Sequence, residues 1–540
     1  MIKGIIFDFD ETLYDYEKCN NSALEELFLK ISDEYKIDLD NIKKCYNNIN
    51  SNIKQSNNYS NKFNKIIYIK QLIEELKIPP ERQDIPLYKI NEYIKLYDTV
   101  FNSNIIIYDG IQDLFKLLKK QKIKIGILTN NKFDQQYNKL IQTNLIQYID
   151  IIQSSDECGY EKPNLNIFLN IQYKMKIPFE NLCIIGDNFN HDIEPTIKLG
   201  SIPFYFSQSN KNEIINNIFY FSDYNWLIYF FNSYFKSVNE LILLSKYFGQ
   251  SDLNVQGSGG NISIKIDNLM LIKSSGCIMG NITNDTDYCI VDTNKCQELV
   301  NLKRDNILET KIFGYKVPSM ESYFHSFMKK YTVHIHFILS NIFGCSKDFK
   351  NIFDDFKYPY CIIEYEVPGI LLSYYIKQKY SSNCDIYFLQ NHGLIISSDN
   401  ICEIFNYYEY IFSYFNNKLN NKYCFESFNI SKKYIENKIY KIVKETTYTK
   451  QLFENMIVCF PDLAVFVQNI CTIDNLDNLE NSDIVIYKNK VYIVTENIYK
   501  AYSLIEIINS YIELEENSKK LVEITNINFL QNMEQEKYRK

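Results

Sequence analysis

Two aspartates, two residues apart, lie at the end of the first apolar stretch of the chain. The stretch runs from Gly4 to Phe9 and contains Asp8, and Asp10 and Thr12 follow. In an extended chain, residues i and i+2 project from the same side, so the two carboxylates repel each other unless a cation lies between them. A hard cation such as Mg²⁺ prefers oxygen ligands and keeps water for a phosphate substrate. One carboxylate can then attack phosphorus while the other protonates the leaving oxygen.

Further polar residues follow later apolar stretches. They are Thr129 and Asn130 after residues 123–128, Lys162 in a Gly-Tyr-Glu-Lys-Pro sequence, and Asp187 and Asp192 after residues 182–185. Short apolar strands separated by helices favour a parallel sheet, whose sites lie at the carboxyl ends of the strands. The sequence therefore predicts a polar site at one edge of such a sheet.

Histidine is scarce, so the positions of the five histidines are informative. His334 and His336 lie two apart, and on a strand both rings project from one face, which suits chelation. Glu321 lies thirteen residues before His334, and His392 follows the apolar stretch 386–389. Three imidazoles and a carboxylate suit Zn²⁺ or a similar divalent ion and leave room for substrate oxygens.

A glycine-rich turn at residues 257–263 precedes these histidines, and the sequence Lys273-Ser-Ser-Gly276 follows the turn. Small residues let backbone N–H groups approach an anion closely, and asparagine and serine side chains add donors. An anion-binding loop is one interpretation of this stretch, and a plain turn is the other.

The pattern of expected helices and strands, which must position these residues, changes along the chain. A segment of helical periodicity at about 16–100 is followed, from about residue 104, by short apolar stretches that alternate with helical ones. The alternation fades near Phe206, and residues 262–272 then alternate apolar and polar side chains, which predicts a β-hairpin. We therefore expect a first domain at 1–206, a linker at 207–237 and a second domain at 238–540.

Composition and charge exclude several classes of protein. The 540 residues are 46% hydrophobic and 23% charged, as in globular domains, which excludes a mainly disordered protein. A net charge of −8 provides no basic field for nucleic acid or an anionic membrane. No apolar stretch approaches the ~18 residues that span a bilayer. Acidic residues interrupt the N-terminal apolar run, unlike a signal peptide, and the 14 scattered cysteines favour a reducing, cytoplasmic setting.

The first set of polar residues resembles the four motifs of the haloacid dehalogenase (HAD) superfamily, in the right order, over residues 1–206. The resemblance implies a Rossmann-like parallel sheet with a helical cap at about 16–100. An acid at position 10 favours phosphatases over dehalogenases. In this resemblance Asp8 is the nucleophile and Asp10 the general acid/base, Thr129, Asn130 and Lys162 bind the phosphoryl group or substrate, and Asp8, Asp187, Asp192 and the main-chain carbonyl of Asp10 form a Mg²⁺ site.

The second set resembles the class II aldolase/adducin family over about 238–540, most closely the aldolase half of rhamnulose-1-phosphate aldolase/dehydrogenase fusions. The matching sequences are Gly-Gly-Asn261-Ile-Ser, Lys273-Ser-Ser275-Gly276, Ser319-Met-Glu321, His334-Ile-His336, Asn-His392-Gly, His325 four residues after the glutamate, a late Phe460-Pro461-Asp462 and the tail 536–539. The resemblance implies an α/β/α domain. In it His334, His336 and His392 bind the metal, Glu321 is a ligand that also acts as acid/base, and Asn261, Ser275, Gly276 and Ser319 line the phosphate or polyol pocket.

Two positions depart from the family pattern. Met320 stands where sugar-phosphate aldolases often have a second small hydroxyl residue, which puts that phosphate contact in doubt. Lys273 replaces a more usual threonine and adds its charge to the anion site.

The two resemblances together imply a cytoplasmic bifunctional enzyme. A Mg²⁺-dependent phosphatase is joined to an aldolase that uses Zn²⁺ or another divalent metal on a phosphorylated ketose or related hydroxyketone. The expected partners are small phosphorylated sugars or aldehydes, with no nucleic acid and no membrane, and family relatives form tetramers, so we expect a homo-oligomer. The alternatives for the second half are a sugar-phosphate dehydratase, such as the methylthioribulose-phosphate enzyme fused to a HAD phosphatase, an epimerase, or a non-catalytic scaffold.

Overall fold

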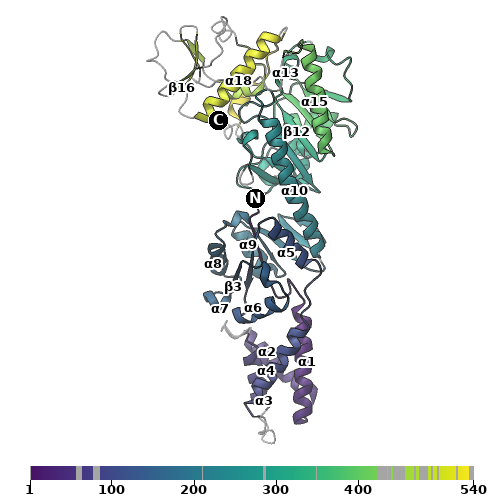
Figure 1. Ribbon diagram of the computed structural model, residues 1–540, viewed down its shortest axis with the longest axis vertical. Coiled ribbons are helices and arrows are strands. Elements are labelled where there is room, and N and C mark those ends of the chain that lie inside the picture. The colour runs from purple at the N-terminus through teal and green to yellow at the C-terminus, as the bar shows by residue number, and fades with distance from the viewer. Residues whose placement is uncertain are drawn as a thin grey trace. The chain divides into compact units, whose positions relative to one another are not determined.

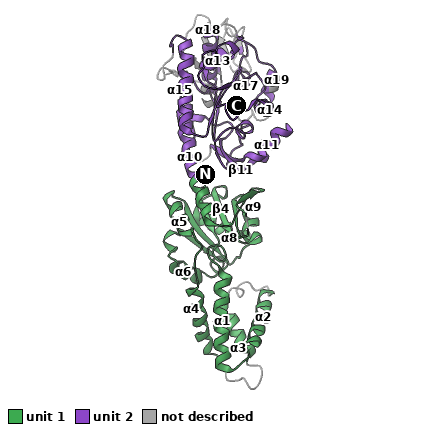
Figure 2. Cartoon of the chain, turned by 90° about the vertical axis from the view of Figure 1, so that its right-hand side faces the viewer, with its two compact units in different colours: residues 1–232 green, residues 233–540 purple. Residues whose placement is uncertain are grey.

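The computed structural model divides into two compact units, residues 1–232 and residues 233–540, coloured green and purple in Figure 2. It describes residues 2–55, 64–76, 86–209, 211–283, 287–347, 349–422, 434–435, 439–441, 456–467, 470–472, 484–487, 490–494, 498–518 and 521–533. The division falls inside helix α10 (Tyr224–Gly249). Each unit is an α/β domain with its own sheet, as the sequence predicts.

Unit 1 contains a seven-stranded sheet in the order β3-β2-β1-β4-β5-β7-β6. Neighbouring strands are parallel except for the antiparallel pair β6 and β7. The strands are β1 (Gly4–Phe7), β2 (Lys124–Thr129), β3 (Ile151–Ser154), β4 (Leu182–Gly186), β5 (Ile202–Phe206), β6 (Glu213–Ile215) and β7 (Ile218–Phe221). Helices on both faces bury the central strands β1 and β4 completely, which explains why these strands are continuous apolar runs.

Four helices between β1 and β2 form the predicted cap (Figure 1). They are α1 (Tyr16–Tyr35), α2 (Leu39–Gln55), α3 (Lys65–Leu76) and α4 (Lys89–Ser103). The sheet is covered by α5 (Ile111–Lys120), α6 (Phe133–Gln142), α7 (Ser155–Cys158), α8 (Leu165–Met175) and α9 (Glu194–Lys198). The core between the sheet and α8 contains Ile6, Leu128, Ile167 and Phe168.

The stretch 207–237, expected as a linker, contains regular structure. It holds the hairpin of β6 and β7, which extends the sheet beyond β5, and the first half of α10. Aromatic side chains attach this hairpin, because the rings of Phe204 and Phe219 stack with centroids 4.4 Å apart. The fading of the strand and helix alternation near Phe206 therefore marks a change from βα units to a hairpin.

Unit 2 contains an eight-stranded sheet in the order β11-β10-β9-β8-β12-β15-β14-β13. Its pairs are antiparallel except β13 with β14. The strands are β8 (Asn261–Ile266), β9 (Leu269–Lys273), β10 (Tyr288–Asp292), β11 (Lys311–Phe313), β12 (Tyr331–Ile335), β13 (Tyr360–Ile363), β14 (Ile386–Leu389) and β15 (Gly393–Ser398). The predicted hairpin at 262–272 is confirmed as β8 and β9, with Asp267 in the turn at φ +50°.

The helices of unit 2 lie between and after these strands. They are α11 (Thr293–Leu302), α12 (Ser322–His325), α13 (Ile338–Gly344), α14 (Ile370–Lys379), α15 (Ile401–Lys418), α17 (Pro461–Phe466), α18 (Ile498–Asn517) and α19 (Ile527–Asn532). A smaller sheet, in the order β16-β17-β20-β19-β18, is formed by β16 (Tyr434–Ile435), β17 (Ile439–Lys441), β18 (Ile470–Thr472), β19 (Ile484–Tyr487) and β20 (Lys490–Val494). The tail 536–539, part of the aldolase resemblance, lies outside the described residues.

Candidate active sites

The carboxyl ends of β1 and β4 bring the first acidic residues together. These strands are parallel neighbours, so Asp8 and Asp187 follow them at the same edge of the sheet. Asp192 approaches from a short π-helix, Phe189–Ile193. One carboxylate oxygen from each of the three aspartates lies within 4.8 Å of the others.

Gly186, the last residue of β4, permits this close packing. A Cβ added there would lie 2.5 Å from Cγ of Asp192, far closer than non-bonded atoms approach. A larger residue at this position would therefore displace the Asp192 carboxylate from the group.

Lys162 supplies positive charge to the three acids. Its Nζ donates to Oδ1 of Asp8 and to Oδ1 of Asp192, each at 2.6 Å. Burial alone would lower the pKa of Lys162, but the charges of Asp192 and Asp8 outweigh it and raise the pKa. Asn130 fixes this lysine, because its Oδ1 accepts from the N–H of Lys162 at 2.7 Å and its Nδ2 donates to the Lys162 carbonyl at 3.1 Å. Asn130 thus contributes by holding the main chain of Lys162.

One lysine does not neutralise three carboxylates. Burial raises the pKa of Asp8, Lys162 opposes this, and the charges of Asp192 and Asp187 raise the pKa further. The pKa of Asp187 is also raised, by burial and then by Asp192. A divalent cation among these acids would favour their ionised forms. The oxygen donors therefore fit Mg²⁺.

The carboxylate of Asp10 lies outside this group and is bound by other residues. Its Oδ1 accepts from Nζ of Lys139 at 2.8 Å and from the hydroxyl of Tyr14 at 2.5 Å, and its Oδ2 accepts from Nε2 of Gln136 at 2.6 Å. Burial would raise the pKa of Asp10, but the charge and hydrogen bond of Lys139, together with the hydrogen bonds of Tyr14 and Gln136, lower it. Sequence reasoning missed Lys139, because no local motif distinguishes it from the other lysines.

Two threonines support the site. Thr129, at the end of β2, is buried, and its Oγ1 accepts from Nε2 of Gln136 at 2.8 Å and from the N–H of Asn131 at 3.1 Å. Oγ1 of Thr12 lies 3.2 Å from Oδ2 of Asp8 and 3.0 Å from Oδ1 of Asp187. Because Thr12 contacts two carboxylates from different strands, it fixes their separation.

A second group of possible metal ligands lies around β12 in unit 2. His334 is in β12, His336 follows this strand, His392 precedes β15, and Glu321 immediately precedes α12. The three imidazole centroids are 4.9 to 5.1 Å apart. Oε1 of Glu321 lies 3.4 Å from Nε2 of His334. One possible ligand atom from each of the four residues lies within 4.8 Å of the others.

Hydrogen bonds behind two of the rings fix their orientation. Nδ1 of His334 faces the carbonyl oxygen of Leu394 at 3.1 Å, and Nδ1 of His336 faces Oδ2 of Asp462. Both partners are acceptors, so each Nδ1 carries the proton and each Nε2 presents a lone pair. Among the described residues, these two Nε2 atoms and Oε2 of Glu321 are buried without a hydrogen-bond partner. Buried acceptors without partners are costly, so this donor set fits a divalent cation such as Zn²⁺.

Residues far along the chain complete this site. Asp462 belongs to the Phe460-Pro461-Asp462 sequence, to which no role was assigned from the sequence. Its carboxylate contacts Nδ1 of His336 directly and so orients this ring. Glu506 in α18 accepts a hydrogen bond from the N–H of Gly257 at 2.7 Å and so holds the glycine-rich turn. No sequence signal marked Glu506.

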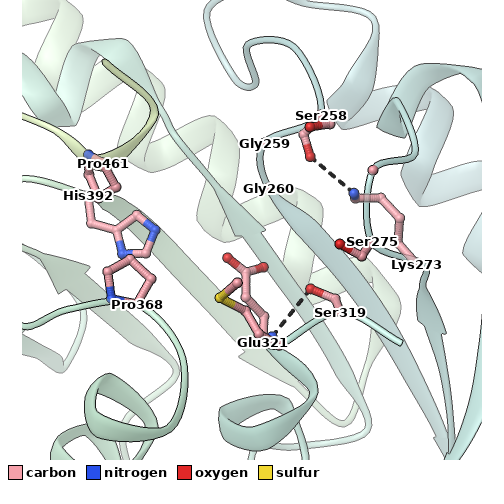
Figure 3. Close-up of a pocket in the computed structure, with 12 residues that line it drawn as sticks. Ser258, Gly259, Gly260, Lys273, Ser275, Ser319, Glu321, Pro368, His392 and Pro461 are labelled. Atoms are coloured by element: carbon pink, nitrogen blue, oxygen red, sulfur yellow. Dashed lines mark hydrogen bonds between the residues drawn. The ribbon is translucent and has the colours of Figure 1, made fainter. Parts of the chain in front are cut away.

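A pocket lies beside this group (Figure 3). The carboxylate of Glu321 lies between His392 on one side and Ser275 and Lys273 on the other. Nζ of the buried Lys273 donates to the carbonyls of Cys277 at 2.8 Å and Ser258 at 3.2 Å. The lining includes the predicted residues Ser275, Gly276, Ser319 and Glu321, together with Lys273, Met320 and Pro461.

Asn261 and His325 are buried next to the site and have other partners. Oδ1 of Asn261 accepts from the N–H of Ile262 at 2.8 Å, and Asn261 is not part of the pocket lining. Nδ1 of His325 lies 2.7 Å from Oγ of Ser263. Burial lowers the pKa of His325 well below its usual range, and the charges of His334 and Lys265 lower it further.

Comparison with known families agrees with these two folds. Residues 5–201 match the family described as haloacid dehalogenase-like hydrolase, and residues 239–416 match the class II aldolase and adducin N-terminal domain. The chain therefore contains a HAD hydrolase domain followed by a class II aldolase/adducin domain.

Individual relatives cover the first domain. Glyceraldehyde 3-phosphate phosphatase of Methanocaldococcus jannaschii is 28% identical over 203 residues, which are 37% of this chain and 83% of the relative. Ribulose-1,5-bisphosphate 5-phosphatase of Halopiger xanaduensis is 21% identical over 215 residues, which are 39% of this chain and 88% of the relative.

Similar solved structures exist for each domain. A HAD phosphatase from Thermococcus onnurineus has a TM-score of 0.34 and 18% identity, covering 42% of this chain and 96% of that one. The N-terminal class II aldolase domain of a conserved protein from Thermoplasma acidophilum has a TM-score of 0.31 and 18% identity, covering 34% of this chain and 93% of that one. Within the described residues, no helix has both the length and the apolar character needed to cross a membrane.

The bond between Asp462 and His336 predicts a role in metal affinity. We expect Asp462→Asn to weaken Zn²⁺ binding by about 10- to 100-fold, the usual effect of losing a carboxylate behind a histidine ligand. Competition with a chromophoric chelator measures this affinity. Asp355→Asn, at an exposed carboxylate paired with Lys418, is the matched control. Equal affinities of wild type and Asp462→Asn would contradict the prediction.

The burial of His325 predicts that its ring stays neutral in mild acid. In the unfolded chain a histidine takes up its proton near pH 6.5. The folded pKa is depressed, so stability contributed by neutral His325 is present above about pH 6.5 and is lost as the pH falls below it. Ring ¹⁵N NMR of metal-free protein, assigned with His325→Gln, should show neutral His325 at pH 5.5. A protonated ring at that pH would contradict this.

Proposed function

We propose that this protein is a bifunctional sugar-phosphate enzyme, with a Mg²⁺-dependent phosphatase in unit 1 and a divalent-metal-dependent aldolase in unit 2. The observation that carries the phosphatase proposal is the contact of Lys162 with both Asp8 and Asp192, within the three-aspartate group. Matches to several phosphatases of small phosphorylated compounds support it.

In the phosphatase, Asp8 attacks phosphorus and the bond from phosphorus to the ester oxygen breaks. Lys162 and Thr129 hold the phosphoryl oxygens, and the protonated form of Asp10 gives its proton to the leaving oxygen. Water then attacks phosphorus, Asp10 takes its proton, and Asp8 is released with inorganic phosphate. Mg²⁺, bound by Asp8, Asp187 and Asp192, would supply positive charge that offsets the charge on the phosphoryl group.

In the aldolase, Glu321 moves the proton whose transfer accompanies cleavage or formation of the carbon–carbon bond. The Glu321 carboxylate is suited to this role because it lies at the pocket between His392 and Ser275. A divalent metal held by His334, His336 and His392 would stabilise negative charge that develops next to a substrate carbonyl. Lys273, Ser275, Gly276 and Ser319 provide positive charge and donors for an anionic or hydroxylated substrate.

Joining these activities has a thermodynamic rationale. Aldol cleavage is reversible, whereas hydrolysis of a phosphate ester is strongly downhill. A phosphatase that consumes the aldolase product therefore draws the reaction toward the free sugar, and covalent linkage raises the effective concentration of one activity near the other. Small phosphorylated sugars or aldehydes are the proposed partners, and a homo-oligomer is the proposed assembly.

Loss of the nucleophile tests the phosphatase. We expect Asp8→Asn to lower kcat for p-nitrophenyl phosphate with Mg²⁺ by more than about a thousandfold, because the amide cannot form the covalent intermediate. Asp113→Asn, at an exposed carboxylate paired with Lys116, should retain wild-type activity. Activity of Asp8→Asn close to wild type would refute the mechanism.

Metal content and carbon–carbon cleavage test the aldolase. We expect stoichiometric divalent metal in the wild type, its loss in His334→Ala/His336→Ala, and aldehyde release from a phosphorylated ketose by the wild type alone. His191→Ala, at an exposed histidine in unit 1, is the control. Metal without cleavage, but with water loss or exchange of a substrate proton, would instead indicate a dehydratase or an epimerase. Absence of metal from the wild type would indicate a scaffold.

A further inference from the structure

A large cavity in unit 1 adjoins the catalytic loop and the cap helices. Its volume is about 830 Å³, and its lining starts at Asp10 and Asn131 and continues along α1, α2 and α3. Asparagine and tyrosine side chains, among them Asn20, Asn50 and Tyr46, line the walls. Such groups suit the hydroxyls of a substrate longer than its reacting phosphate.

Lys65, the first residue of α3, is part of the lining of this cavity. Its Nζ lies 5.1 Å from the ring centre of Tyr68 and 5.9 Å from that of Tyr97. The described residues offer this amine neither a hydrogen bond nor an ion pair. Burial lowers the pKa of Lys65 to about 8, and the positive charges of Lys54 and Lys139 lower it further. An anion placed there would therefore meet unneutralised positive charge.

Three lysines of the cap differ from Lys65 because each forms an ion pair. Lys30 pairs with Glu34 at 3.0 Å, Lys70 with Glu74 at 2.7 Å and Lys89 with Glu92 at 2.8 Å. Lys43 and Lys54, which line the cavity with Lys65, form no ion pair within the part of the chain that the structure describes. The three lysines of the cavity lining thus have no carboxylate partner among the described residues.

Acidic residues also line the cavity, and none of them pairs with Lys65. Asp10 is bound by Lys139. Glu11 accepts a hydrogen bond from the N–H of Glu17 at 2.5 Å, and burial raises the pKa of Glu11 to about 7. Glu17 and Glu25 are exposed on α1. The positive charge of Lys65 is therefore left for an anionic group that enters the cavity.

We propose that Lys65, with Lys54 beside it, binds a second anionic group of the phosphatase substrate. The substrate class is then a polyhydroxyl phosphate monoester that carries a further phosphate or carboxylate. This inference rests on the proposed phosphatase and goes beyond it by assigning the cap residues that select the substrate. A charge-assisted contact of this kind raises kcat/KM by about 10- to 100-fold for a substrate with the second anionic group, relative to the same substrate without it.

The experiment uses the full-length protein with Mg²⁺ and two matched pairs of substrates. Fructose 1,6-bisphosphate against fructose 6-phosphate tests a second phosphate, and 6-phosphogluconate against glucitol 6-phosphate tests a carboxylate. We expect the wild type to prefer the more anionic member of at least one pair by about 10-fold or more. The pair that shows the preference identifies the anionic group.

Lys65→Met should remove that preference, and Lys65→Arg, which keeps the charge, should retain most of it. Lys70→Met, on the same helix but at a lysine paired with Glu74, is the matched control and should keep the wild-type ratio. Circular dichroism checks that each variant is folded. Because the readout is a ratio of two substrates for one variant, a partial loss of folded protein does not alter it.

The outcomes separate this inference from the proposed function. If the wild type hydrolyses p-nitrophenyl phosphate but shows no preference in either pair, or if Lys65→Met keeps the preference, the anion subsite is refuted and the phosphatase stands. If the wild type hydrolyses no phosphate ester at all, the proposed phosphatase itself fails.

Discussion

Mutual repulsion among Asp8, Asp187 and Asp192 is the constraint that the rest of unit 1 satisfies. Three carboxylates with one lysine form a stable group only if their positions are fixed and positive charge is added. Parallel pairing of β1 and β4 fixes two of them, and the absence of a side chain at Gly186 admits the third. Backbone geometry therefore determines where the three carboxylates of this site can meet.

Unit 2 combines three imidazoles with a single carboxylate, that of Glu321. The imidazoles are buried, and burial lowers the pKa of His334 to about 4, with Glu321 opposing and His336 adding to the effect. The lone pairs of three imidazoles can bind one cation only if they all point to one place. The carbonyl of Leu394 and the carboxylate of Asp462 impose that direction from behind the rings. Orientation, rather than charge balance, governs this site.

The sequence predicts those parts of the two sites that depend on local order. Asp8, Thr129 and Asp187 follow apolar runs, and strands of a parallel sheet place their carboxyl ends at one edge, so the fold class and these neighbours could be expected. The proximity of His334 and His336 could also be expected, because residues two apart in an extended chain project from the same face. Lys139, Glu506 and Lys65 could not be predicted, because their roles arise from contacts across long separations in the chain. The hydrogen bonds of Asn130 to the main chain of Lys162 could not be predicted either, and the expected contact of Asn130 with substrate stays a prediction.

The hydrogen bond between His336 and Asp462 also has a consequence for the order in which parts of the protein are completed during synthesis. These residues are separated by 126 positions, and Asp462 lies beyond the segment that matches the aldolase family. At roughly 5–20 residues per second, a ribosome needs about 6–25 s to travel from one to the other. During that interval the nascent chain already contains every residue of the three-aspartate group, while His336 still lacks the carboxylate that orients it. The orientation of His336 by Asp462 is therefore a late event of biosynthesis, after the first unit has its complete sequence.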